Sequence, residues 1–134
     1  MCIRDSTTII SAMETLNTTV EPAELLGNAQ EEYVTFKRRA GHISALKSPG
    51  LMEYLAEKGV KSLLLAGLST SGCVLRTAVQ ATDEEFVVTV IRDGCADPKE
   101  GLHDTLMGSV LNSRAYVVTA DHFQELYENT MGQR

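Results

Sequence analysis

The chain has 134 residues, of which 43% are hydrophobic, and its formal net charge at pH 7 is −6. This length predicts one domain at most, and the absence of a Lys/Arg cluster argues against a nucleic-acid partner. No apolar stretch of the sequence reaches the roughly 18–20 residues that a membrane span needs, which argues against a membrane partner.

The first six residues, Met1-Cys2-Ile3-Arg4-Asp5-Ser6, resemble the translation of a sequencing adapter. We therefore leave residues 1–6 out of the fold as an artefact and expect the natural chain to begin upstream. Residues 7–32 are polar and mixed, with a short helical turn expected at Ala23–Ala29. We predict an irregular, partly helical segment there.

Residues 33–134 are expected to form the folded region, which begins with a short strand and a helix. Aromatic and β-branched side chains predict the strand at Tyr33–Phe36. Ser48 is expected to cap the helix with Pro49 at its first position, and Gly59 to end it in a left-handed conformation.

Two further strands follow, with a helix between them. The near-continuous apolar run Ser62–Ala66 predicts a strand that is buried on both faces of a parallel sheet. Phe86–Ile91 is the clearest strand of the sequence. The helix between them, over residues 72–83, is expected to bury the apolar positions Val74, Ala78 and Ala81.

The last predicted elements are a helix, a strand and a helix. Asp97 is expected to cap the first of these helices, with Pro98 at its first position and Glu100 completing a capping box. The apolar stripe of this helix consists of Leu102, Leu106, Val110 and Leu111. A strand at Ala115–Val118 and a helix at Asp121–Asn129 follow. The alternation of strands and helices predicts an α/β fold with a parallel sheet.

Three groups of candidate site residues follow the predicted strands. Lys37 comes after the first strand, Gly67–Cys73 after the second, and Asp93-Gly94-Cys95 after the third. Ligands of open parallel sheets bind outside the carboxyl ends of the strands. We therefore expect the site at this edge of the sheet.

Cys73 is the candidate nucleophile, because it follows a turn of small residues where a helix is expected to begin. Unpaired backbone N–H groups and the positive end of the helix dipole favour the thiolate over the thiol at such a position. The alternative is a buried cysteine that packs as a small hydrophobe, which is the commonest fate of an isolated cysteine. Position favours the catalytic role.

The other polar residues are weaker candidates. Lys37 is either a solvated charge or, if it lies near Cys73, a cation that favours the thiolate. Asp93 either contacts the site or caps the loop that follows it, whereas Cys95 lacks a glycine-rich turn and is expected to pack. Surface or capping roles are expected for Arg38, Arg39, His42, His103 and His122, although one of the two arginines could meet an anionic substrate.

Cysteine number and motif spacing exclude several other functions. The three cysteines form no framework spacing, which predicts reduced thiols and a cytoplasmic location. Without CxxC or HExxH spacing we expect neither a metal nor a cofactor. The nucleophile elbow G-x-S-x-G fails because Ser71 replaces its second glycine, and the P-loop and dinucleotide motifs are absent.

The segment Gly67–Ala78, GLSTSGCVLRTA, resembles the G-x-x-T-x-x-C-V signature of isochorismatase-like cysteine hydrolases. Phe36-Lys37-Arg38-Arg39 is similar to the strand that carries the lysine of that family, and Val87–Ala96 to its next strand and loop. The resemblance covers roughly residues 33–128. It implies a three-layer α/β sandwich around a mostly parallel sheet.

The resemblance also implies a reaction on a small-molecule substrate. Cys73 would attack the carbonyl of a non-peptide, amide-type C–N bond and form a thioester, while Lys37 would position an aspartate and stabilise charge. The sequence departs from the family at this aspartate, because Asp5 lies in the adapter-like segment and follows no apolar strand. The first strand, first helix and second strand of the family are not found, so we expect the chain as given to be inactive. For the full-length protein the resemblance implies a homo-oligomer.

The family's turn geometry can be transferred to this sequence as well. It implies a cis peptide between Leu68 and Ser69, and an oxyanion hole formed by the N–H groups of Ser69 and Cys73. Thr70 and Asp93 are then candidates for lining the site. The alternative function is a non-catalytic α/β module that holds a small anion at the turn, and a serine hydrolase is a more distant possibility.

Overall fold

The computed structural model describes residues 34–132, so the expectations for residues 1–6 and 7–32 and for Tyr33 lie outside it. Three parallel strands form its sheet in the order β1-β2-β3. Their bounds are β1 Ser62–Leu68, β2 Val87–Ala96 and β3 Tyr116–Val118. The predicted α/β fold with a parallel sheet is confirmed.

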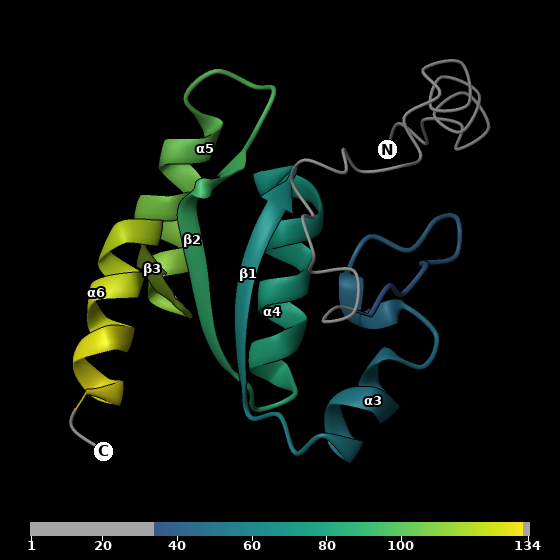
Figure 1. Cartoon of the computed structure of the whole chain (residues 1–134). Coiled ribbons are helices and arrows are strands. Elements are labelled where there is room, and N and C mark those ends of the chain that lie inside the picture. Colours follow the sequence, from purple (N-terminus) through teal and green to yellow (C-terminus); the bar gives the residue numbers. More distant parts are fainter. Residues whose placement is uncertain (1–33, 133–134) are drawn as a thin grey trace, which may run out of the picture.

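Helices cover both faces of this sheet (Figure 1). Helix α4 (Leu75–Asp83) and the π-helical turn η4 (Leu106–Val110) pack on the face that carries Val88 and Val90. Helix α6 (Ala120–Met131) lies against the other face, where it meets Thr89. Side chains alternate between the two faces of a strand, so helices, sheet and helix form three layers.

The core lies mainly between α4, η4 and the sheet. As predicted, Val74, Ala78 and Ala81 are buried, with 4%, 1% and 0% of their surface exposed. Met107 in η4 and Leu111, which starts the 3-10 turn η5 (Leu111–Ser113), complete this core at 1% exposure each. Within the described residues no helix is long and apolar enough to cross a membrane.

The strand expected at the start of the folded region does not form. Residues 34–36 have no regular secondary structure, so the prediction of a strand at Tyr33–Phe36 is wrong for the three residues that the structure describes. A strand needs a neighbour to pair with, and β1 pairs only with β2. The Phe36 ring packs instead on Tyr54 of helix α3 (Leu51–Glu57), with the ring centroids 5.4 Å apart.

Two predicted helix starts also differ from the structure. Ser48 ends the short 3-10 turn η2 (Ala45–Lys47), and Gly50, at φ 81°, is the residue that precedes α3. Asp97 does not cap a helix, because α5 (Leu102–Thr105) begins only after Gly101, at φ 70°. Glycine tolerates these positive φ values without a steric penalty. The left-handed Gly59 after α3 is confirmed at φ 64°.

The carboxyl ends of β1 and β2 extend further than the apolar runs predict. Gly67 pairs with Cys95 and Leu68 with Ala96, after an irregularity between Leu65 and Gly67. This pairing carries both strands to the edge at which the candidate site was expected. The prediction that β1 is buried on both faces is wrong, because Leu64 and Leu68 keep 50% and 74% of their surface exposed. Within the described residues no strand pairs with the outer edge of β1.

Candidate functional site

The turn that carries Cys73 connects β1 to α4. The peptide bond between Leu68 and Ser69 is cis, at the position where the resemblance places such a bond. The π-helical turn η3 (Thr70–Val74) follows, and the Ser69 carbonyl accepts hydrogen bonds from the N–H groups of Gly72 and Val74, at 3.1 and 3.2 Å. The thiol of Cys73 is free and partly exposed just before α4 begins. This is the position in the fold that the sequence predicted.

Thr77 lies one helical turn beyond the cysteine and contacts it. The Thr77 hydroxyl oxygen is 3.8 Å from the Cys73 sulfur and accepts a hydrogen bond of 2.8 Å from the N–H of Ala45. Only 4% of the Thr77 surface is exposed. Sequence reasoning did not single out this residue, although the spacing of four places both side chains on the same helix face.

Asp97 holds the turn from the connection between β2 and α5. Its Oδ2 accepts a hydrogen bond of 2.7 Å from the N–H of Ser71, and its Oδ1 accepts one of 3.1 Å from the N–H of Lys99. The hydroxyl and N–H of Ser71 lower the pKa of the Asp97 carboxyl, and Lys99 adds to this effect. The carboxylate is therefore the stable form at this place, because hydrogen bonds to the charged form favour it.

His103 of α5 makes a second contact with the turn. Its Nδ1 lies 2.8 Å from the hydroxyl oxygen of Thr70, which is fully buried. The sequence placed His103 in a surface or capping role and Thr70 among the lining candidates. The structure joins the two, and with Asp97 it brings a carboxylate and an imidazole to the turn. Their position after the carboxyl end of β2 was the signal that could have found both.

Lys37 lies apart from this arrangement. Its side chain is exposed in a segment without regular secondary structure, and no hydrogen bond or ion pair between described residues joins it to Cys73. The neighbouring Arg38 donates a hydrogen bond from Nη1 to the carbonyl of Ile43, and Arg39 is exposed. Within the described residues, Cys73 thus lies between β1 and α4, and Lys37 makes no hydrogen bond or ion pair with it.

Asp93 and Cys95 make contacts with neighbouring elements of the fold. Asp93 Oδ1 accepts a hydrogen bond of 2.9 Å from the N–H of Ala120, so it caps the start of α6 and not the loop that directly follows. Cys95 packs in the core as predicted, and burial raises the pKa of its thiol. The backbone of Gly67 acts in the opposite direction, while the negative charge of Asp93 adds to the rise. Cys95 therefore stays a thiol under conditions in which an exposed cysteine begins to ionise.

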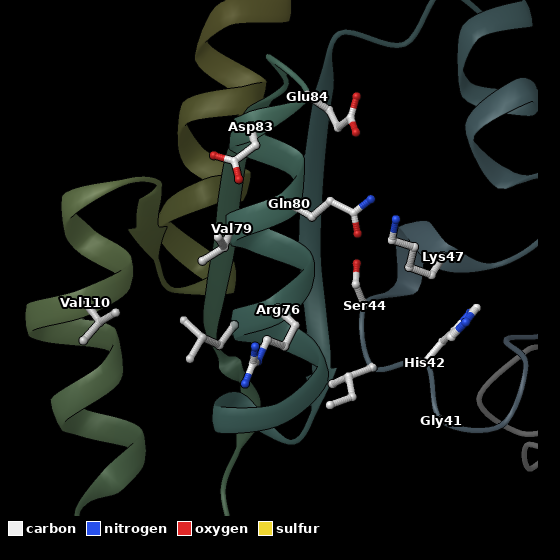
Figure 2. A pocket seen from close by; sticks show the side chains of 12 residues that line it. Gly41, His42, Ser44, Lys47, Arg76, Val79, Gln80, Asp83, Glu84 and Val110 are labelled. Atoms are coloured by element: carbon white, nitrogen blue, oxygen red, sulfur yellow. The ribbon is translucent and has the colours of Figure 1, made fainter.

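A separate open groove of about 960 Å³ lies on the outer side of α4 (Figure 2). It runs between α4 and the segment 41–47, and its lining includes Ser44, Lys47, Arg76 and Gln80. Cys73 does not line it. Across residues 34–132, no group of three or more His, Cys, Asp or Glu side chains could hold a metal ion.

The sequence was compared with those of known protein families and of individual proteins. A sequence model of the isochorismatase domain matches residues 9–122. A maleamate amidohydrolase from Pseudomonas putida is 33% identical over 86 residues, which are 63% of this chain and 40% of that protein.

Solved structures agree with this match. An isochorismatase-like hydrolase from Alkaliphilus metalliredigens has a TM-score of 0.56 at 30% identity, covering 59% of this chain and 43% of that one. A nicotinamidase from Bacillus subtilis has a TM-score of 0.52 at 32% identity, covering 57% and 42% respectively. The chain thus spans less than half the length of each of these relatives.

Proposed function

Because the chain belongs to the isochorismatase family, we propose that it carries the nucleophile of a hydrolase that cleaves amide-type C–N bonds of small molecules. The position of Cys73, partly exposed between the end of β1 and the start of α4, carries this proposal. Relatives named for amide substrates, a maleamate amidohydrolase and a nicotinamidase, support the substrate class.

The proposed reaction proceeds through a thioester on Cys73. The thiolate attacks the amide carbonyl carbon, and the N–H groups of Ser69 and Cys73 stabilise the negative charge that develops on the carbonyl oxygen. A bond forms between sulfur and carbon, the C–N bond breaks, and the leaving nitrogen takes up a proton as ammonia or an amine. Water then hydrolyses the thioester and regenerates the thiol. Lys37 would stabilise charge once its segment is placed beside the cysteine.

The proposed reaction also needs an aspartate that transfers these protons, and we assign this role to no residue of the sequence. Asp97 is a carboxylate that contacts the turn, but both of its oxygens already accept hydrogen bonds, from the N–H groups of Ser71 and Lys99. We therefore propose that the chain as given acylates slowly or not at all, and that an upstream strand ending in an aspartate restores turnover.

The alternative of an anion-binding module is less well supported. An anion at this turn would need free N–H donors, yet the N–H of Ser71 donates to Asp97 and the N–H of Gly72 donates to the Ser69 carbonyl. These two contacts leave the Ser69–Gly72 segment fewer N–H donors than the anion-binding alternative needs.

Two measurements test the proposed function. Iodoacetamide should label Cys73 selectively at pH 7, and peptide mass spectrometry should show much slower labelling of the buried Cys95. Ammonia release from maleamate and nicotinamide should appear in a chain extended upstream and vanish in its Cys73→Ala variant, whereas Cys95→Ala retains it. Unreactive Cys73, or turnover that survives Cys73→Ala, would overturn the proposal.

A further inference from the structure

We propose that Thr77 is a positioning residue for Cys73, whose hydroxyl donates its proton to the cysteine thiolate while the N–H of Ala45 holds the hydroxyl in place. Thr77 belongs to the same site as the proposed hydrolase, and its effect on catalysis rests on that proposed function. The contact itself can be measured without turnover.

The two contacts of the Thr77 hydroxyl determine where its proton points. A hydroxyl has one proton to donate and two lone pairs that accept, and a thiolate can only accept. The N–H of Ala45 can only donate, so it occupies a lone pair of Thr77 Oγ1 at 2.8 Å. When Cys73 is a thiolate, which has no proton of its own, the hydroxyl donates its proton to the sulfur at 3.8 Å, a distance that suits the large sulfur atom.

The other threonines of the described α-helices show that this arrangement is specific to Thr77 among them. A threonine inside a helix commonly donates to a carbonyl three or four residues earlier. Thr82 donates in this way to Val79, and Thr105 and Thr130 donate to Gly101 and Leu126. The hydroxyl of Thr77 instead has Ala45 and Cys73 as its partners.

The contact also connects two separate parts of the chain. Ala45 starts η2, which follows the segment that contains Lys37, whereas Cys73 lies in η3 and Thr77 in the first turn of α4. Thr77 is 4% exposed, so water competes little for its hydroxyl. One buried hydroxyl thus orients the sulfur and anchors the end of the lysine-bearing segment against the helix.

The test is the pH dependence of the alkylation of Cys73 by iodoacetamide in the full chain, with labelled peptides resolved by mass spectrometry. Thr77→Val removes the hydroxyl, and we expect the midpoint of the profile to rise by about one pH unit, with about tenfold slower labelling below it. Thr77→Ser keeps a hydroxyl and should restore the profile. Thr77→Ala replaces the valine variant if circular dichroism shows that the latter does not fold.

Thr82→Val is the matched control, because it removes a hydroxyl from the same helix that contacts only the Val79 carbonyl. It should leave the midpoint unchanged. The titratable groups that contact the turn, Asp97 of the β2–α5 connection and His103 of α5, are the same in every variant, as is the charged Arg76 on α4. A folded hydroxyl-free variant with an unchanged midpoint, or a shift as large in Thr82→Val, overturns the proposal. The absence of turnover in a chain extended upstream would contradict the proposed function and leave the Thr77 contact untouched.

Discussion

The turn that carries Cys73 and the segment that carries Lys37 contrast in how they are held. Asp97 of the β2–α5 connection and His103 of α5 both contact the turn, and Thr70 within it is fully buried. The side chains of residues 34–43 are mostly exposed, and the segment has no regular secondary structure. The turn is therefore held by side-chain contacts within the described residues, whereas residues 34–43 are held by few such contacts.

The open edge of the sheet explains this difference. Among residues 34–132, strand β1 pairs with β2 on one side and with no strand on the other, and its Leu64 and Leu68 keep 50% and 74% of their surface exposed. An edge strand with unpaired backbone groups and exposed leucines is a place where further structure normally pairs or packs. The turn at the end of β1 is nevertheless held, because its partners come from the opposite side of the strand.

The largest expected effect separates the core between α4, η4 and the sheet from the lysine segment. Leu111→Ala creates a cavity at a position that is 1% exposed, so we expect a loss of about 2–5 kcal/mol in the free energy of unfolding. Val34→Ala changes a side chain that is 55% exposed and should cost less than about 0.5 kcal/mol. Urea unfolding followed by circular dichroism measures both. Equal losses would show that the two regions are held alike.

A smaller effect tests the contact between the turn and α5. Thr70→Val removes the buried hydroxyl that pairs with His103, and it should cost about 1–3 kcal/mol of unfolding free energy, because the ring nitrogen loses its partner. The matched control is Thr105→Val, whose exposed hydroxyl bonds only to the Gly101 carbonyl. We expect that control to change stability by less than about 0.5 kcal/mol. A similar loss in both variants would mean that the His103 contact does not hold the turn.

Asp97 offers a test of the same turn through pH. Its folded-state pKa is lowered by the hydrogen bonds from Ser71, so it stabilises the fold above its unfolded value of about 3.9, and this contribution is lost as the pH falls through the lower folded value. Asp97→Ala should therefore lower the urea midpoint at pH 7 by less than Thr70→Val does, because the carboxylate is exposed to solvent. The difference from the unchanged chain should shrink as the pH falls below about 3.9 and disappear once the pH lies below the folded-state pKa of Asp97, and a difference that persists there would contradict the assignment.

The sequence predicted the elements whose signals are local. The apolar runs at 62–66 and 86–91 identified β1 and β2, and the left-handed Gly59 was placed correctly. Cys73 was recognised because a strand, a turn of small residues and a helix follow one another along the chain. These features depend on neighbours in the sequence, so no knowledge of the fold was needed to find them.

The predictions that failed depend on partners distant in the chain. Asp97 has the pattern of a helix cap, yet its carboxylate bonds to Ser71, 26 residues away. Phe36 has the propensity of a strand, but without a strand beside it the ring packs on Tyr54 instead. A local sequence pattern indicates which roles a residue can take, and its neighbours in the folded chain determine which of these roles it has. The role of Thr77 was missed for the same reason, because its hydroxyl is oriented by Ala45, 32 residues away.

The smallest expected effect concerns Lys37 itself. Lys37→Met changes an exposed side chain that no hydrogen bond or ion pair between described residues joins to the turn, so stability should change by less than about 0.5 kcal/mol. For the same reason the pH profile of Cys73 alkylation should stay unchanged in this chain, where Thr77→Val moves it. In a chain extended upstream, with a strand to hold residues 34–36, the same substitution should slow the labelling. If Lys37→Met already shifts the profile in the present chain, the lysine reaches the cysteine without that strand, and the contrast between the two regions no longer holds.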